Sequence, residues 1–514
     1  MLVHVKLDGV VPAPVAIACW RCSKFTPQAR CAMAQQAAAA VTLASFPDDA
    51  FLLVVAACGD TEDGVPLLEA VKGLGGLCKG IQQQLCRLRP LVGVRSLAGV
   101  QRPAHVPWHV VLLYTGVPTM AVVDQARQGR VRSIVAMHGP QPRVTTLAPA
   151  VARRVVPCLL GAGCSLIKLE MWQARLNNTW AATFGEAAVC SAVLRELTLF
   201  ECGLRGPLPE LRLPALLRLC VTASNCSLSS EPNQLAGSLE PLRGCTALQV
   251  LCLSNNQLTG GLKPLERCTA LKVLALHNNQ LTGDLEPLKS CTALQELCLK
   301  NNQLTGGLEP LRSCTALQEL SLNNNQLTGG LEPLRSCTAL QELSLNNNQL
   351  TGGLEPLKSC TALQILHLDT NQLTGDLEPL RGCTALEELS LNNNQLTGDL
   401  EPLRSCTALQ ELSLNNNQLT GDLEPLRSCT ALGRLWLSGN HLTGGLEPLR
   451  GCTALEIISL CDNQLTGGLG PLQCCTALEL LELKNNQLVP SDEDKAHFEK
   501  QCGWEEEEED VYSD

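Results

Sequence analysis

The sequence predicts an α/β protein, mainly a curved solenoid with a parallel β-sheet on its concave face and short helices or turns on its convex face. A smaller, partly helical region is expected at the amino end. Two observations predict this fold. A 23-residue unit recurs along most of the chain, and its leucines are spaced for a short strand. At 514 residues the chain exceeds what one ordinary core supports, whereas a stack of repeats extends its core with length.

The regular unit is Leu-x-x-Leu-x-Leu-x-x-Asn-x-Leu, in eleven copies. Ile458 is the one substitution among the strand leucines. The copies begin at Leu248, Leu271, Leu294, Leu317, Leu340, Leu363, Leu386, Leu409, Leu432, Leu455 and Leu478. Because the same leucines recur in each copy, every copy is expected to bury them against its neighbours.

Two looser copies precede the regular array. The first, Leu194 to Leu199, has Cys202 where Asn belongs, and the second, Leu216 to Val221, is followed by an insertion. An irregular turn from Leu166 to Met171 is a candidate start of the stack.

Each part of the unit has a physical role. The Leu-x-Leu segment is a strand, and the long return path makes successive strands parallel at about 4.8 Å spacing. The Asn amide is expected to turn inward and satisfy backbone groups that the strands leave unpaired. A Gly after Thr permits a tight turn, and Pro suits the first turn of a short helix. Glu309 is expected to pair with Arg312, three residues further on.

Residues 194–488 resemble the leucine-rich-repeat family, and the Leu-Thr-Gly-x-Leu ending of the unit is similar to the plant-type subclass. The resemblance implies a curved solenoid whose concave sheet binds protein or peptide partners. The unit is one residue shorter than the usual plant-type unit, and the chain has no kinase signature, so the biology of receptor kinases is not carried over.

Cysteine usage bears on the compartment. Eleven of the 28 cysteines occupy one position of the unit, each before Thr-Ala-Leu, where a small apolar side chain packs inward. A ladder of equivalent thiols has no unique disulfide pairing, so free thiols in a reducing compartment are expected. The amino terminus also lacks a clear secretory signal. These observations favour the cytoplasm, with the nucleus as the second possibility. Met1 and Met33 are both candidate starts.

Charge is divided unevenly along the chain. Residues 1–190 hold 18 Lys and Arg against 10 Asp and Glu, so they carry +8, and the remaining residues carry −19 of the total of −11. An acidic main body repels nucleic-acid phosphate and favours a partner with a basic surface. No apolar stretch reaches the roughly 18 residues that a membrane helix needs.

Residues 46–80 resemble an F-box, whose pattern opens with Leu-Pro-Asp-Asp and an apolar helix. The matching run is Phe46-Pro47-Asp48-Asp49, followed by the apolar residues that include Leu52 and Leu53. Phe46 departs from the pattern, and a glycine-rich segment replaces its later part. The resemblance implies that these residues dock a Skp-type adaptor of an SCF-type ubiquitin ligase, with the solenoid selecting the substrate. The alternative is a pair of amphipathic helices that caps the solenoid.

No constellation in the sequence indicates catalysis, a cofactor or a metal. Cys19 and Cys22 lack a second ligand pair for zinc. Residues 73–80 do not meet the spacing of a phosphate-binding loop. His105 and His109 are separated by Pro107, which argues against a helix that would aim both at one metal. The chain is therefore expected to be non-enzymatic.

A partner-binding site is expected on the concave sheet, where residues flanking the second framework leucine point outward. Many copies present glutamate there, which forms either a merely soluble face or an acidic stripe that steers a basic partner. Among the copies that depart from this pattern, two stand out, one with Ile365, His367 and Asp369 and the other with Arg434 and Trp436. An exposed Trp beside an Arg is typical of a binding hot spot. The candidate residues are Glu296, Glu319, Glu342, Ile365, His367, Asp369, Glu388, Glu411, Arg434 and Trp436.

The sequence thus divides into five expected segments. They are an extension with partial disorder (1–45), an F-box-like segment or helical cap (46–80), a mixed region leading into irregular repeats (81–190), the solenoid (191–488), and a capping helix with an acidic tail (489–514). The helix is expected to begin after Ser491 and to cover the last repeat with Phe498. The predicted function is to hold a protein or peptide partner, and the F-box resemblance implies that it does so as a ligase substrate receptor. The alternative is an extracellular or surface recognition module.

Overall fold

The computed structural model describes seven parts of the chain. They are residues 52–56, 109–113, 133–137, 166–172, 189–200, 202–222 and 233–502. The chain divides into two compact units, Met1–Gln234 and Leu235–Asp514.

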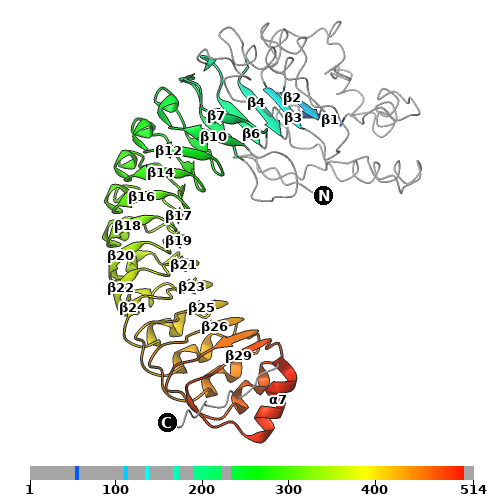
Figure 1. Cartoon of the computed structure of the whole chain (residues 1–514), viewed down its shortest axis with the longest axis vertical. Coiled ribbons are helices and arrows are strands. Elements are labelled where there is room, and N and C mark those ends of the chain that lie inside the picture. The colour runs from blue at the N-terminus through cyan, green and yellow to red at the C-terminus, as the bar shows by residue number, and fades with distance from the viewer. Residues whose placement is uncertain are drawn as a thin grey trace, which may run out of the picture. The chain divides into compact units, whose positions relative to one another are not determined.

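In the second unit, successive repeats form a parallel sheet, the inner sheet, which lines the concave side of this unit (Figure 1). Equivalent residues of neighbouring repeats pair directly, as Leu320 does with Leu343. The strands are β11 (Val250–Cys252), β13 (Val273–Ala275), β15 (Glu296–Cys298), β17 (Glu319–Ser321), β19 (Glu342–Ser344), β21 (Ile365–His367), β23 (Glu388–Ser390), β25 (Glu411–Ser413), β26 (Arg434–Trp436), β27 (Ile457–Ser459) and β29 (Leu480–Glu482). The solenoid that the repeat period predicts is confirmed.

A second row of short strands follows the Asn corner of the repeats and also pairs in parallel, as Thr305 and Gln326 do. These strands are β10 (Gln234–Gly237), β12 (Gln257–Gly260), β14 (Gln280–Gly283), β16 (Gln303–Gly306), β18 (Gln326–Gly329), β20 (Gln349–Gly352), β22 (Gln372–Gly375), β24 (Gln395–Leu396), β28 (Thr466–Gly467) and β30 (Gln487–Leu488). The glycine that ends most of them has a positive φ, as Gly306 does at 80°, which a side chain would strain.

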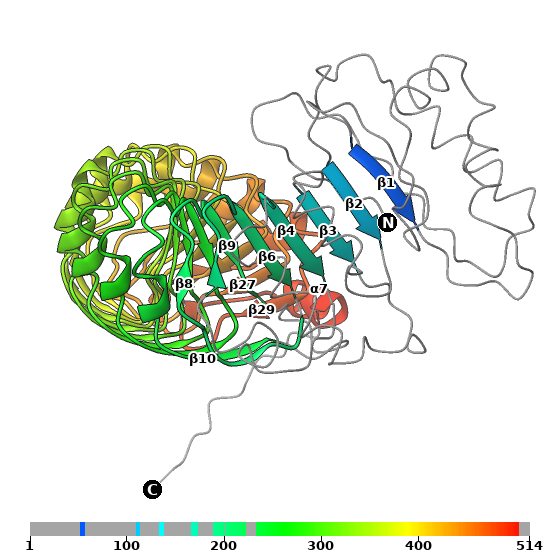
Figure 2. The same cartoon turned by 90° about the horizontal axis from the view of Figure 1, so that it is seen from above.

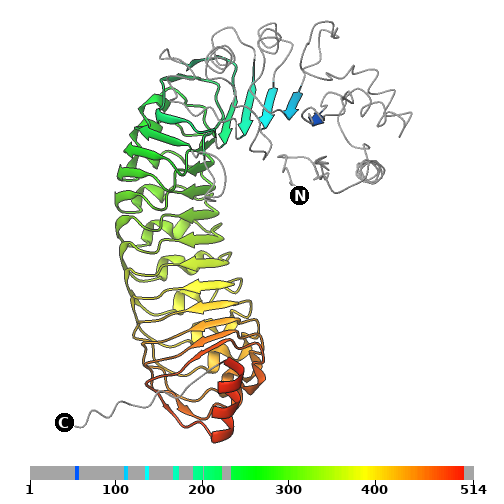
Figure 3. The same ribbon diagram turned by 45° about the vertical axis from the view of Figure 1, so that its right-hand side comes forward.

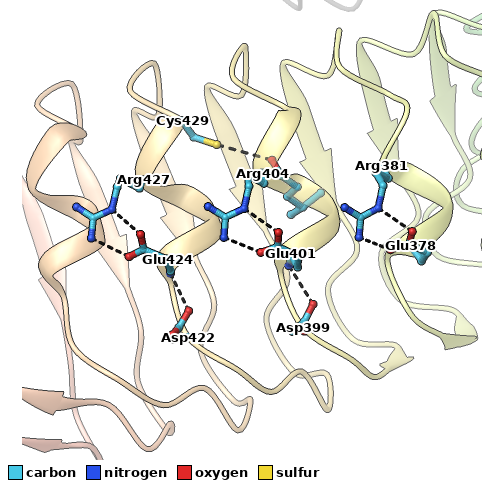
Figure 4. A network of polar contacts seen from close by, with 10 residues as sticks. Glu378, Arg381, Asp399, Glu401, Arg404, Asp422, Glu424, Arg427 and Cys429 are labelled. Atoms are coloured by element: carbon cyan, nitrogen blue, oxygen red, sulfur yellow. Dashed lines mark hydrogen bonds and ion pairs between the residues drawn. The ribbon is translucent and has the colours of Figure 1, made fainter.

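The short helices expected at the prolines are 3-10 helices with Pro in the first turn, and nine of the eleven carry an ion pair between residues three apart. Glu309 and Arg312 make the pair predicted from the sequence, with Nε to Oε1 at 2.6 Å. Figure 4 shows three such pairs in successive coils. The helices are η1 (Glu240–Leu242), η2 (Lys263–Leu265), η3 (Glu286–Leu288), η4 (Glu309–Leu311), η5 (Glu332–Ser336), η6 (Glu355–Ser359), η7 (Glu378–Leu380), η8 (Glu401–Ser405), η9 (Glu424–Ser428), η10 (Glu447–Gly451) and η11 (Gly470–Cys474).

The ladder cysteines lie in the core with the framework leucines. All eleven, from Cys245 to Cys475, are fully buried. Each thiol from Cys268 onward donates to the carbonyl oxygen of the preceding ladder cysteine, over 3.4 to 3.6 Å. Burial raises the pKa of the Cys291 thiol to about 12, so it stays protonated at neutral pH. The interpretation of these cysteines as small buried side chains is confirmed.

The motif asparagines form a second internal ladder, which confirms their expected role. The Asn279 Oδ1 accepts the backbone N–H of Leu258 in the preceding repeat at 2.9 Å. Its Nδ2 donates to the carbonyls of Leu253 and Leu276, each at 3.0 Å. The same arrangement recurs to Asn486. One side chain per repeat therefore satisfies three backbone groups at the corner where the strand ends.

The described strands of the first unit also stack in parallel, side by side (Figure 2). The six strands of this ladder are β1 (Leu52–Ala56), β2 (His109–Leu113), β3 (Ser133–Met137), β4 (Lys168–Trp172), β6 (Glu196–Phe200) and β9 (Arg218–Cys220). Three short strands outside the ladder are β5 (Val189–Cys190), β7 (Arg205–Pro207) and β8 (Leu211–Arg212). Partners along the six-strand ladder are 57, 24, 35, 28 and 22 residues apart. The ladder thus includes the turn at Leu166 to Met171, and it extends further towards the amino end at irregular intervals.

The prediction of a helix at the start of the F-box-like segment is wrong for Leu52 and Leu53. These two residues belong to strand β1 and pair with His109 and Val110. The run Leu-Leu-Val-Val-Ala is short and includes two β-branched residues, and a fully buried parallel strand has this continuous apolar character. Phe46, Pro47 and Asp48 lie outside the described residues, as does the acidic tail.

The carboxyl-terminal helix α7 (Asp492–Cys502) follows the last repeat, as Figure 3 shows. The Ser491 Oγ accepts the backbone N–H of Asp494 at 3.1 Å, and the Asp494 carboxylate accepts the backbone N–H of Ser491 at 3.2 Å. Phe498 is fully buried, and Gln501 donates to the carbonyl of Cys475 at 2.8 Å. The predicted cap of the solenoid is confirmed.

Candidate functional site

Side chains on the concave face follow the period of two along each inner strand. In β19, Leu343 is fully buried, whereas Glu342 is exposed and Ser344 is half-buried. The framework leucines face the core because they pack against those of the adjacent repeats. The residues between and after them face outward and are free to vary without disturbing the stack.

Three of the candidate glutamates form a row on adjacent strands. Glu296 pairs in register with Glu319, which pairs with Glu342. The pKa of the Glu319 carboxyl is raised, first by desolvation and then by the charges of Glu296 and Glu342. Like charges directly opposite each other on neighbouring strands destabilise a sheet. This row therefore works against the fold.

The row is interrupted at the first departing repeat. There Ile365 stands in register between Glu342 and Glu388, and His367 follows it on β21. The second departing repeat lies three strands further along, where β26 carries Arg434 and Trp436. Its neighbour β25 places Ser413 in register with Trp436.

A hollow of about 350 Å³ opens between these two departing repeats. Four residues that pair in register on adjacent strands line it, namely His367, Ser390, Ser413 and Trp436. Two small serines thus lie between two large rings. The hollow is lined by Asn346, His367, Asp369, Glu388, Leu389, Ser390, Glu411, Ser413, Asn415 and Trp436.

Two ion pairs stand along one edge of the hollow. The His367 Nε2 lies 3.3 Å from a Glu388 carboxylate oxygen, a contact that is ionic when the imidazole is protonated. The Arg434 guanidinium contacts Glu411 on the adjacent strand. Both pairs join neighbouring strands, and both involve a side chain that departs from the regular array.

A hydrogen-bonded row forms the opposite edge of the hollow. The Asp369 Oδ1 accepts from the Ser390 hydroxyl at 2.5 Å and from the backbone and side-chain nitrogens of Asn392 at 2.9 and 2.7 Å. One repeat further, the Asn392 Oδ1 accepts from Ser413 at 2.9 Å and from the Asn415 backbone at 2.7 Å. These bonds fix the side chains that bound the hollow.

One atom in this edge has no partner. The buried Asn346 Oδ1 accepts no hydrogen bond, and it is the one such side-chain atom within the described part of the chain. In the next two repeats the equivalent oxygens accept from Ser390 and Ser413. His367 stands where the corresponding serine would be, so the Asn346 oxygen lacks the hydroxyl donor that Asp369 and Asn392 have.

The backbone of this repeat also differs from that of its neighbours, at Thr370. Thr370 has a φ of 52°, a conformation that β-branched residues rarely adopt and that asparagine occupies in the neighbouring repeats. Exposed amides at this position form a ladder, as when Asn347 donates to Asn324 at 2.8 Å and Asn416 to Asn393 at 2.9 Å. Thr370 interrupts that ladder beside the hollow. Strain of this kind is concentrated at functional sites.

The structure brings six of the ten candidate residues to the hollow, which are His367, Asp369, Glu388, Glu411 and Trp436 in its lining and Arg434 at its edge. Glu296, Glu319 and Glu342 lie on the same face outside it, and Ile365 separates the two glutamate groups. Sequence reasoning placed Ser390 and Ser413 on the concave face beside Glu388 and Glu411, but it missed Asn346 and Asn415. Their signal is that they neighbour a departing residue in register, which a repeat-by-repeat alignment of the sequence would show.

Across the residues that the structure describes, no three His, Cys, Asp or Glu side chains are grouped to hold a metal ion. In that same part of the chain, no helix has the length and apolar character to cross a membrane.

Comparison with known protein families gives a match to part of the repeats. The family model described as leucine-rich repeats (two copies) matches residues 246–290, 292–336, 338–382, 384–428 and 407–451. A comparison with the curated proteins gives no match.

Solved structures share the fold. They include a plant peptide hormone receptor, RGFR1, in complex with RGF2 (22% identity, 73% of this chain and 61% of that chain, TM-score 0.55). The Arabidopsis receptor kinase HAESA with the peptide hormone IDA and the co-receptor SERK1 has 20% identity over 75% of this chain and 74% of that chain, with a TM-score of 0.51. A leucine-rich-repeat protein of Leptospira interrogans has 22% identity over 76% of this chain and 92% of that chain, with a TM-score of 0.51. The chain spans about three fifths of the length of the first plant receptors that it matches, 61% and 62%.

Proposed function

We propose that this chain, whose residues 246–451 are leucine-rich repeats, is a non-enzymatic protein that holds a protein or peptide partner on its concave face. One observation carries the proposal. Two of the repeats that depart from the Glu-Leu-Ser pattern of the inner strands, those of β21 and β26, bound the same hollow. A solenoid gains nothing for its own stability from a tryptophan on that face, whereas Trp and Arg are common anchors in protein interfaces.

The charge of this face favours a basic partner. Glu296, Glu319 and Glu342 repel one another in adjacent strands, which a cationic partner would relieve. Residues 191–514 carry −19, so the surrounding field attracts a positive surface over a longer range. Electrostatic attraction of this kind raises the association rate and selects among partners more than it adds affinity.

The experiment is a capture of partners from a cell extract by the full chain, with Trp436→Ala as the matched variant. A partner counts only when purified and measured by calorimetry. Trp436→Ala is expected to weaken its binding by at least about 2 kcal/mol while the unfolding midpoint stays unchanged. Arg450→Ala, on a 3-10 helix, is the control and should bind like the wild type. If Trp436→Ala binds a verified partner with wild-type affinity, the anchor is not on this face.

The cytoplasm, or the nucleus, is the proposed compartment. None of the eleven ladder cysteines is in a disulfide, and a fully buried row of thiols is compatible with a reducing environment. Protein purified from its native source, denatured and alkylated without reductant, is expected to have most of the eleven ladder cysteines alkylated. Disulfides at most of them would instead favour the extracellular alternative, in which the chain binds a ligand as peptide hormone receptors do.

A role as the substrate receptor of an SCF-type ubiquitin ligase is a further hypothesis for residues 46–80. Strand β1 speaks against it, because the F-box pattern requires a helix where Leu52–Ala56 pairs as a strand. The full chain tested against a purified Skp-type adaptor, with a known F-box protein in parallel, decides the matter. We expect no binding at tens of micromolar adaptor, and binding in that range would restore the ligase hypothesis.

A further inference from the structure

We propose that the hollow between β21 and β26 binds the guanidinium group of an arginine side chain supplied by the partner. This inference rests on the proposed function and names the chemistry that the site recognises. It follows from the shape of the hollow, from its surplus of negative charge, and from the acceptors along its edges.

The shape is that of a slot for one side chain. In the register His367, Ser390, Ser413, Trp436, two small residues lie between two rings. Three strand spacings separate the outer residues, about 14 Å between their backbones. A volume of about 350 Å³ is at the low end for ligand pockets, which suits one long side chain rather than a larger molecule.

The charge of the slot selects a cation. Its lining contains the carboxylates of Asp369, Glu388 and Glu411 and no Lys or Arg. Arg434 at the edge offsets one of them by contacting Glu411. The lining therefore keeps a negative surplus, which a cationic side chain would complement.

The acceptors and the ring favour a guanidinium over an ammonium. Glutamates stand along one edge, and the carboxylate of Asp369 belongs to the other. A planar group with five N–H donors can bond to acceptors on both sides at once, whereas an ammonium has three donors on a single nitrogen. The half-buried Trp436 supplies a ring face on which a guanidinium stacks.

The experiment uses the full chain and three fluorescein-labelled peptides of sequence Gly-Ser-X-Gly-Ser, blocked at the carboxyl end, with X as arginine, citrulline or lysine. Citrulline has nearly the shape of arginine without its charge. Fluorescence anisotropy at low salt is expected to give an arginine peptide affinity about tenfold or more above that of citrulline. The lysine peptide is expected to bind more weakly than the arginine peptide.

Two matched pairs of variants locate the binding. Glu388→Gln is expected to weaken binding of the arginine peptide about tenfold. Glu332→Gln, the same change on a 3-10 helix outside the inner sheet, is expected to leave that binding unchanged. Ser413→Leu fills the slot without a change of charge and should abolish binding, whereas Ser344→Leu on β19 should not. Thermal unfolding of each variant checks that it is folded.

Three results would overturn the inference, namely equal binding of arginine and citrulline peptides, equal binding of arginine and lysine peptides, or equal effects of Ser413→Leu and Ser344→Leu. Its failure differs from failure of the proposed function. If a verified partner loses affinity with Trp436→Ala while the arginine peptide does not bind, the concave face is the binding surface and the arginine slot is wrong. If neither result is obtained, both are wrong.

Discussion

The two faces of the solenoid carry glutamates in opposite situations. On the 3-10 helices, Glu332 is held by Arg335 at 2.7 Å within the same repeat, and this hydrogen bond is the main cause that lowers the pKa of its carboxyl. On the inner sheet, Glu319 is flanked by Glu296 and Glu342, and its pKa is raised by desolvation and by their charges. Figure 4 shows the paired arrangement in three successive coils.

The glutamates of the 3-10 helices support the fold, whereas those of the inner sheet do not. A repeat that supplies its own counter-charge on one face could do so on the other, but the regular copies place glutamate, not lysine, in adjacent strands. The paired charges contribute modestly to the stack, and the unpaired ones oppose it. The concave charges are therefore best explained by something outside the chain.

The largest test of this contrast compares two neighbours on strand β19. Leu343→Ala removes a fully buried side chain and is expected to lower the free energy of unfolding by about 2–5 kcal/mol. Glu342→Ala, one residue away and exposed, is expected not to lower it. A denaturant titration of both variants makes the measurement. A loss below about half a kcal/mol for Leu343→Ala would mean that this strand does not alternate as described.

The next test concerns the internal ladder of motif asparagines, which belongs to neither face. The Asn394 Oδ1 accepts from the backbone of Leu373 at 3.0 Å, and its Nδ2 donates to Leu368 and Leu391, each at 3.1 Å. Asn394→Ala leaves these buried groups unpaired and is expected to cost about 1–3 kcal/mol in chemical unfolding. The control is Gln395→Ala on the next, exposed residue. Equal effects from the two variants would contradict the ladder's role.

The smallest expected effect is that of Glu319→Gln. Desolvation and then the charges of Glu296 and Glu342 raise the folded-state pKa of Glu319, so its ionised form opposes folding above that pKa. This penalty is lost as the pH falls through the pKa. The variant is expected to be more stable than the wild type at pH 7 by about 0.2–0.5 kcal/mol, since exposure screens the repulsion. The difference should vanish below the ordinary value of 4.5. Paired urea titrations at pH 7 and pH 4 measure it, and a destabilised variant at pH 7 would contradict the repulsion.

Sequence reasoning predicted the parts that repeat. The inner strands, the inward Asn, the Glu309–Arg312 pair and the buried cysteines all follow from a fixed period, because each copy supports the same assignment independently. The capping helix also followed from local signals, with Ser491 before an acidic first turn.

The parts without a period were less predictable. Strand β1 pairs with β2 across 57 residues, so neither strand repeats a neighbouring pattern, and a short apolar run fits a helix or a strand equally well. The sequence indicated one side of the hollow, since Trp436 and His367 differ from the equivalent residues of the other copies. It did not indicate the other side, because the Asn346 oxygen lacks a hydroxyl donor through a substitution in the next repeat.

The most direct test of the contrast between the faces is one comparison of unfolding midpoints. Glu296, Glu319 and Glu342 are replaced by Gln in one variant, and Glu309, Glu332 and Glu355 in the other, so both lose three charges of the same kind. The first variant is expected to unfold at a higher denaturant concentration than the wild type, because repulsion is removed, and the second at a lower one, because ion pairs to Arg312, Arg335 and Lys358 are lost. Midpoints that shift in the same direction would contradict the account, because the concave charges would then serve the fold as the convex ones do.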